Sequence, residues 1–278
     1  QAAAALRQSR LGEAWKACLE EFTAEKRSAR RETRLRRLFR AVTHWCTGPM
    51  DEDTDPLEKA CLYSLRTGQP AEQYAACRLV EASLCVGLLD GIGTSLDRQL
   101  RRIVETVQRA TPVRVAAVRA LAMSMWVLDH QEDAELFLDW MELVASQEYR
   151  NETTPAALRA TALDAWTLAA CNLSNFYISG QDDVNMGRGL AILELLCSVL
   201  EEDESKSWSM EVRAAAGQAI SLINEARIAF GTMDDAENVT ARRFKKGTWE
   251  GSKFEATMDE IGQLVASLAT ESRPHLSK

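Results

Sequence analysis

The sequence has 278 residues and a formal net charge of −8, and 46% of its residues are apolar. This length and apolar content suffice for one large domain or a repeat array, and the acidic balance excludes a strongly basic, nucleic-acid-coating chain. Glycine (14), proline (6) and aromatic residues (6%) are sparse, which favours helices because strands are enriched in β-branched and aromatic side chains.

About eleven helices are predicted, separated by turns that contain glycine or proline. In chain order they cover about 13–24, 28–46, 56–66, 70–88, 95–109, 112–128, 131–146, 155–177, 185–200, 208–229 and 253–269. Several prolines fall near a helix N-terminus, where the missing N–H has no intrahelical partner to lose. No segment alternates with the period of two that indicates a strand. None reaches the roughly 18 consecutive apolar residues of a membrane span.

The second helix of each predicted pair begins at nearly regular intervals. These helices begin near Ala29, Ala71, Val113, Ala157 and Val212. The first three intervals are 42, 42 and 44 residues and the last is 55, which indicates an insertion near 201–207. A period of about 40–47 residues with two helices per unit is typical of HEAT and armadillo repeats. We therefore predict an all-α fold, an α-solenoid of HEAT/armadillo-like helix pairs. It forms a single domain over 1–278, with about five pairs, a closing helix and a loop at 231–252.

Two of these second helices share a local pattern. One reads VRVAAVRA from Val113 and the other VRAAAGQA from Val212. Small residues let neighbouring helices approach closely, and the arginine after each valine can reach a carboxylate or carbonyl in the adjoining turn. Such stacked pairs bury their apolar faces only against neighbours, and they offer a surface for binding partners.

Motifs for catalysis and metal binding are missing from the sequence. It holds no P-loop, GxSxG, HExxH or kinase signature, and the glycines at 91–93 are interpreted as a helix-ending turn. The seven cysteines form no CxxC pair and only three histidines are present, so we predict buried, reduced thiols in a reducing compartment. We therefore predict no enzymatic activity, catalytic residue, metal site, cofactor or small-molecule substrate.

The densest basic run lies at 26–40, where eight cations and one anion give a net charge of +7. On a helix, the apolar positions Leu35, Leu38, Phe39, Val42 and Trp45 would form the buried stripe. We call the cations of the N-terminal half the basic ridge: Lys26, Arg27, Arg30, Arg31, Arg34 and Arg37. A second cluster in a predicted loop contains Arg242, Arg243, Lys245 and Lys246.

These two clusters admit two interpretations. Lysines and arginines along a ridge can track phosphates by displacing condensed counterions from nucleic acid. Alternatively, the ridge is a solvated face that pairs with the protein's own acidic segments at 51–53 and 201–204. A membrane-binding role is disfavoured because the ridge lacks an opposing exposed apolar face.

Five segments, taken in chain order, share the motifs of one known family. They are KRSAR at 26–30, LYSLRTG at 62–68 followed by Glu72 and Gln73, LDAWTL at 163–168, MEVRAAAG at 210–217 with INEAR at 223–227, and LVASLATES at 264–272. Together these segments resemble the interferon-related developmental regulator family. The resemblance is distributed over roughly 10–276. It implies an armadillo-like helical region without enzymatic activity.

The resemblance also implies partners. Members of that family are linked to translationally inactive ribosomes, so we expect contacts with ribosomal RNA and ribosomal proteins, and a cytoplasmic location. The alternative implied is a nuclear transcriptional co-regulator that binds proteins such as histone deacetylase complexes. The family's short basic C-terminal region has no counterpart before Lys278, and we expect it to be absent from this chain.

Overall fold

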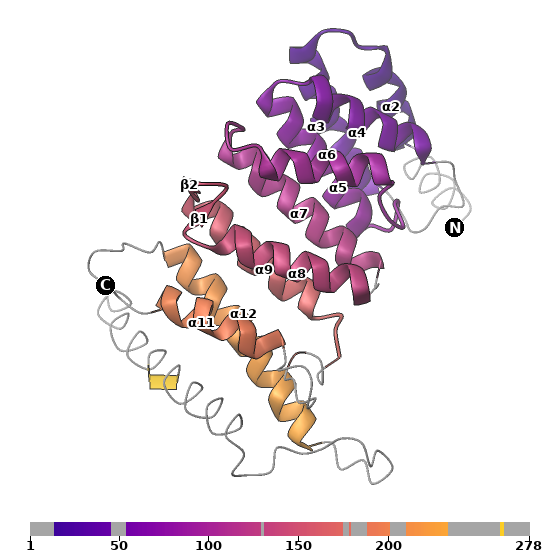
Figure 1. Ribbon diagram of the computed structural model, residues 1–278. Coiled ribbons are helices and arrows are strands. Elements are labelled where there is room, and N and C mark those ends of the chain that lie inside the picture. The colour runs from indigo at the N-terminus through magenta and orange to yellow at the C-terminus, as the bar shows by residue number, and fades with distance from the viewer. Residues whose placement is uncertain are drawn as a thin grey trace, which may run out of the picture. The chain divides into compact units, whose positions relative to one another are not determined.

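Figure 1 shows the computed structural model, in which most of the chain is helical. The structure describes residues 14–45, 54–128, 131–174, 188–200 and 210–232, together with 178 and 262–263. The chain divides into two compact units, Gln1–Asp133 with Arg150–Leu158 and Ala134–Tyr149 with Arg159–Lys278. The single domain that the sequence predicted over 1–278 stays a prediction. In a repeat, each helix pair contacts mainly its neighbours, so a division into compact units is compatible with one continuous array.

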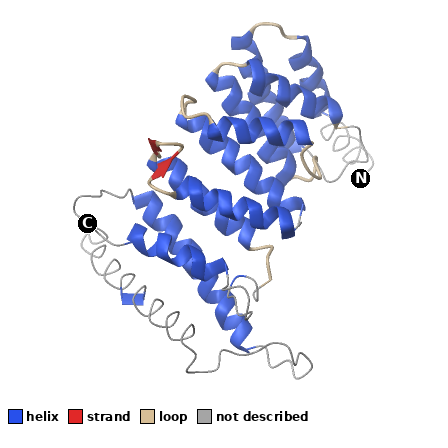
Figure 2. Cartoon of the chain, in the orientation of Figure 1, coloured by secondary structure: helices blue, strands red, loops and turns tan. Residues whose placement is uncertain are grey.

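Six described helices of the first unit form two layers. They are α2 (Ala14–Ala24), α3 (Ser28–Trp45), α4 (Asp55–Thr67), α5 (Pro70–Cys85), α6 (Thr94–Glu105) and α7 (Thr111–Leu128). In chain order, α2 packs on α3, α4 on α5 and α6 on α7. One layer stacks α3, α5 and α7, and the other stacks α2, α4 and α6, as labelled in Figure 1 and drawn in the same orientation in Figure 2. The predicted all-α helical repeat is confirmed.

The interior of this unit lies along α5 and α7. Small residues such as Ala76, Ala117 and Ala120 are fully buried there, and they let the helices of this layer approach closely. By length and composition, α7 could cross a membrane, but 56% of the apolar window Thr111–Leu128 is buried. Because α7 packs on both α5 and α6, we describe it as a core helix.

The second unit contains most of α8 (Gln131–Ala145) and α9 (Ala156–Ala170), together with α11 (Arg188–Leu200) and α12 (Met210–Thr232). The buried Trp166 of α9 donates its indole Nε1–H to Glu142 of α8 at 3.0 Å. Helix α11 packs on α12. Two strands of two residues each, β1 (Glu148–Tyr149) and β2 (Glu152–Thr153), lie between α8 and α9, where the sequence predicted none.

The observed helices confirm the predicted period. The second helices begin at Ser28, Pro70, Thr111, Ala156 and Met210, at intervals of 42, 41, 45 and 54 residues. The predicted insertion at 201–207 lies outside the described residues. So does most of the predicted loop at 231–252 and of the closing helix at 253–269, although 262–263 are helical.

Three predicted helices end earlier than expected. Helix α5 ends at Cys85 rather than 88, because Gly87 adopts a φ of +69° and Leu88 donates its N–H to the Ser83 carbonyl at 2.9 Å. This left-handed turn is a Schellman motif, and glycine adopts it without a Cβ clash. Helix α6 ends at Glu105 rather than 109, because Thr106 is extended and its hydroxyl donates to the Arg102 carbonyl at 2.7 Å. Helix α9 ends at Ala170 rather than 177.

Candidate nucleic-acid interface

The basic ridge begins in the turn between α2 and α3, with Lys26 and Arg27, and continues into the first half of α3. The helix is anchored through Leu35, Leu38 and Val42, which are fully buried as predicted, whereas Phe39 is partly exposed. The side chain of Trp45 lies outside the described residues. The charged half of α3 is thus held in place by its apolar stripe, but its six cations lie in three different environments.

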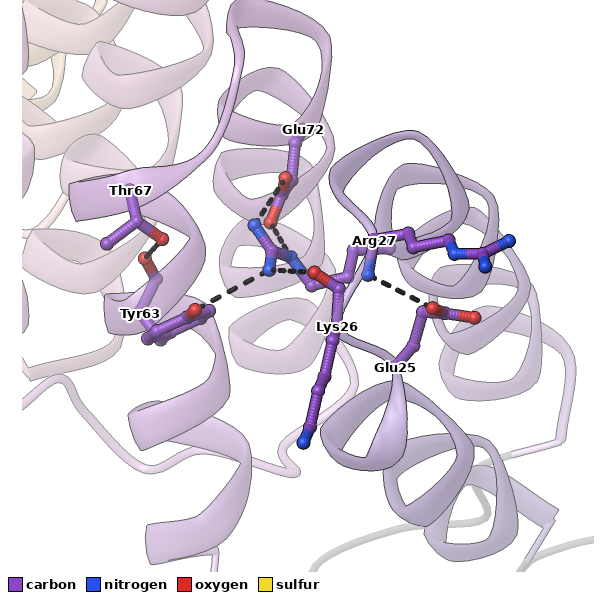
Figure 3. A network of polar contacts seen from close by, with 7 residues as sticks. Glu25, Lys26, Arg27, Tyr63, Thr67 and Glu72 are labelled. Atoms are coloured by element: carbon purple, nitrogen blue, oxygen red, sulfur yellow. Dashed lines mark hydrogen bonds and ion pairs between the residues drawn. The ribbon is translucent and has the colours of Figure 1, made fainter.

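Arg31 is buried and belongs to an interior network with Glu72 and Tyr63, which are labelled in Figure 3. Its Nε donates to Glu72 Oε1 at 2.8 Å and its Nη2 to Oε2 at 3.3 Å. Its Nη1 donates to the Lys26 carbonyl at 3.2 Å and to the Tyr63 hydroxyl at 3.5 Å. The hydrogen bond to Glu72 raises the pKa of Arg31 above its ordinary value. The sequence predicted Arg31 as a contact residue of the ridge; its burial and pairing remove it from the exposed surface.

Arg34 and Arg37 both pair with Glu21 of α2. The Nη1 of Arg37 lies 2.9 Å from Glu21 Oε2, and Arg34 forms an ion pair with the same carboxylate oxygen. The partner is therefore an acid on the neighbouring helix. The sequence had proposed the acidic segments at 51–53 and 201–204 as partners, and these lie outside the described residues. One carboxylate between two arginines leaves this part of the ridge with a net positive charge.

Lys26, Arg27 and Arg30 are exposed at the N-terminus of α3. Glu25 lies beside them, where its carboxylate accepts the Arg27 backbone N–H at 3.0 Å. This hydrogen bond, together with the charges of Arg30 and Arg27, lowers the pKa of the Glu25 carboxyl. The first turn of α3 contains no acidic residue. Three cations therefore surround a helix end that is itself partially positive, which is the strongest concentration of positive charge on the ridge.

The second cluster, Arg242, Arg243, Lys245 and Lys246, lies outside the described residues. The role assigned to it from the sequence stays a prediction. Within the part of the chain that the structure describes, no group of three or more His, Cys, Asp or Glu side chains could hold a metal ion.

A hydrogen bond between the two helices of a pair recurs along the chain, and the sequence predicted it at only some of its positions. In four second helices, α3, α5, α7 and α9, the fourth residue donates to a backbone carbonyl at or near the end of the preceding helix. The donors are Arg31 to Lys26 at 3.2 Å, Gln73 to Leu65 at 3.0 Å, Arg114 to Val104 at 2.9 Å and Arg159 to Ala145 at 2.7 Å. The sequence predicted this role for the arginine after Val113, and the structure confirms it. Gln73 and Arg159 were missed, although the repeat period would have aligned them.

Sequence reasoning also missed Tyr63 on α4. Its side chain is 51% exposed and the guanidinium carbon of Arg31 lies 5.1 Å from its ring centroid. The sequence did contain a sign of this residue, because Lys59 and Arg66 lie one helical turn before and one turn after Tyr63 and so share its face of the helix. The structure thus adds an exposed aromatic ring to the basic surroundings of the ridge.

The comparison with known families identifies one match. The family model described as Interferon-related developmental regulator (IFRD) matches residues 4–278, nearly the whole chain. No curated protein and no solved structure gives a significant match. The family match confirms the resemblance that the five sequence segments indicated.

Proposed function

The chain belongs to the interferon-related developmental regulator family, and from this premise we propose that it is a non-catalytic regulator that binds translationally inactive ribosomes. The exposed part of the ridge contacts ribosomal RNA, and the acidic surfaces of the chain meet basic ribosomal proteins. The protein acts in the cytoplasm in this proposal. This activity requires a binding surface and no catalytic residue, cofactor or metal.

The single observation that carries the proposal is the exposed cluster of Lys26, Arg27 and Arg30 on a chain with a net charge of −8. A uniformly acidic surface would repel RNA, whereas a local cluster of cations at a helix N-terminus attracts phosphate groups. Arg31 donates to the backbone carbonyl of Lys26, and this hydrogen bond holds the backbone at the start of the cluster. The cluster therefore supports a specific contact better than a general affinity for nucleic acid.

Sucrose-gradient sedimentation of purified 80S ribosomes with the protein tests this proposal. We expect the wild-type chain to sediment with 80S particles at low salt. The double variant Arg27→Glu/Arg30→Glu should bind more weakly, and the slope of log K against log salt should become shallower by roughly 0.7–0.9 for each lost phosphate contact.

The matched control is Arg98→Glu/Arg102→Glu, which makes the same change in net charge at two exposed arginines of α6. It should sediment as the wild type does. Failure of the wild-type chain to accompany 80S particles at low salt would overturn the proposal. Equal loss in both double variants would show that net charge, and not the ridge, governs binding.

A nuclear co-regulator scaffold is the second candidate. Leu136 and Leu143 of α8 are 69% and 61% exposed, and their spacing of seven residues places them on one face of the helix. Such a face suits an apolar protein surface better than RNA. Affinity capture from nuclease-treated nuclear extract tests this candidate, because partners that survive RNA digestion and are lost in Leu136→Ser/Leu143→Ser favour it.

A further inference from the structure

We infer that Tyr63 is a stacking platform for an unpaired base of single-stranded RNA. We define the tyrosine platform as Tyr63, Lys26, Lys59 and Arg66, with Arg31 beneath it. The inference deepens the proposed function and rests on it, since it names the form of RNA that the region of the ridge accepts.

The Tyr63 ring is held in place from the interior. Arg31, anchored by Glu72 through two hydrogen bonds, lies 5.1 Å from the ring centroid and also donates to the Tyr63 hydroxyl at 3.5 Å. Glu72 and Arg31 have side chains only 1% and 8% exposed, so this support is rigid. A ring that is fixed before binding loses little conformational entropy when a base stacks on it. Half of the tyrosine nevertheless stays open to solvent.

Exposed cations flank Tyr63 along α4 and in the turn before α3. On α4, Lys59 and Arg66 are exposed and lie one turn to either side of Tyr63. In the turn before α3, the carbonyl of Lys26 accepts a hydrogen bond from Arg31 Nη1, the same nitrogen that donates to the Tyr63 hydroxyl. The Lys26 side chain extends away from Glu72, as Figure 3 shows. Lys59 forms an exposed ion pair with Asp55, which is worth little in water.

An aromatic ring between exposed cations fits single-stranded nucleic acid. Bases stack on the ring while the phosphates on either side meet lysine or arginine, and every base has a face that can stack. Paired bases of an A-form duplex are stacked on one another and present phosphates and groove edges instead. An acidic peptide would use the cations but would gain little from the ring. The platform therefore predicts a preference for single-stranded over duplex RNA.

Fluorescence anisotropy with the full chain tests this inference. The probes are a fluorescein-labelled, mixed-sequence RNA of about twelve nucleotides and the duplex of the same RNA. We expect Tyr63→Ala to weaken single-strand binding on the order of tenfold and to leave duplex binding within about twofold of wild type, because only the single strand stacks. Tyr63→Phe keeps the ring and should bind as the wild type does.

Tyr74 provides the control, because it is an exposed tyrosine (41%) on α5 with a cation on one side only along its helix, Arg78, which is partly buried and paired with Glu81. Tyr74→Ala should leave both affinities unchanged. If Tyr63→Ala lowers the melting temperature, Tyr63→Leu replaces it, since leucine keeps apolar contacts without an aromatic face.

Three results would overturn the inference: unchanged single-strand binding by Tyr63→Ala and Tyr63→Leu, an equal loss for single strand and duplex, or competition by polyglutamate as effective as that by unlabelled RNA. The last result would indicate a protein partner. If the chain fails to sediment with ribosomes but gives the expected anisotropy result, the proposed function alone is overturned. If it sediments with ribosomes but Tyr63→Ala leaves single-strand binding unchanged, only the tyrosine platform is overturned.

Discussion

Arg30 and Arg31 are neighbours in the sequence, yet their environments differ completely. Arg30 is exposed in the first turn of α3, whereas Arg31 lies in the interior against Glu72. An exposed ion pair contributes at most about 1 kcal/mol because water screens it. Removing one partner of a buried pair leaves an uncompensated charge and costs about 3–5 kcal/mol. At the scale of single residues, burial therefore separates the structural arginines of the ridge from those available to a partner.

Glu72→Ala is expected to destabilise the protein by about 3 kcal/mol, because it leaves the Arg31 charge buried without its carboxylate. Urea unfolding followed by circular dichroism measures this change. The control is Arg36→Ala, which breaks the exposed i,i+4 pair with Glu32 and should cost about 0.5 kcal/mol. Similar losses in the two variants would contradict the buried-pair interpretation.

The buried thiols of Cys61 and Cys77 predict a loss of stability at alkaline pH. Burial raises the pKa of Cys61 to about 12 and raises that of Cys77 further. The unfolded chain, with thiols near their ordinary value of 9.0, therefore loses its protons first as pH rises. Stability should be insensitive to these groups below pH 9. Above it, each thiol should lower stability by about 1.4 kcal/mol per pH unit until the folded pKa is reached.

Urea midpoints measured at pH 8 and pH 10 check this slope. Cys77→Ala should lower stability at both values and reduce the difference between them, because one titrating thiol is gone. A pH dependence identical to that of the wild type would rule out the thiols as its source. Cys171→Ala serves as the comparison, since that thiol is exposed and burial raises its pKa less than that of Cys77, so its removal should change the difference less.

At the scale of the helix, four helix pairs are linked by the same kind of hydrogen bond, from the fourth residue of the second helix to a carbonyl at or near the end of the first. The last carbonyls of a helix have no intrahelical partner, and a buried carbonyl without a hydrogen bond costs about 1–3 kcal/mol. Arg114 and Arg159 are 3% and 5% exposed, so water does not replace them. Burial lowers the pKa of Arg159 to about 10, which still leaves it charged at neutral pH.

Arg114→Ala is expected to cost about 2 kcal/mol, because the Val104 carbonyl loses its donor. Arg114→Gln should retain part of that stability, since Gln73 makes the same kind of contact with Leu65 one pair earlier. Thermal unfolding of the two variants measures the difference. Equal destabilisation by alanine and glutamine would show that the charge or the length of the arginine matters, and not the carbonyl contact.

At the scale of the whole molecule, a helix repeat should respond locally to damage. Stability in such arrays is a sum of contributions from each pair and from its nearest neighbours. Helices α3, α4 and α5 surround Glu72 in the first unit, whereas α11 and α12 belong to the second.

Glu72→Ala should therefore raise amide hydrogen exchange in α3, α4 and α5 and leave exchange in α11 and α12 unchanged. Hydrogen exchange read by mass spectrometry resolves these segments. A uniform increase across both units would mean that the chain unfolds as one cooperative domain.

Tertiary structure decided which cations of the ridge are available, because the partners of Arg31, Arg34 and Arg37 come from other helices. Glu72 lies 41 positions after Arg31 and Glu21 lies 13 positions before Arg34. No periodicity within α3 could place them. The same reason explains why Tyr63 was missed, since its support comes from α3.

The sequence by itself determined the helices, their period near 42 residues and the family, because these depend on local propensity and on spacing along the chain. The interaction surface depended on which side chains from separate helices meet, and burial then converted one candidate contact, Arg31, into a structural residue. Local rules act over one or two turns of helix, whereas burial and pairing act between elements, and only the folded chain brings those together.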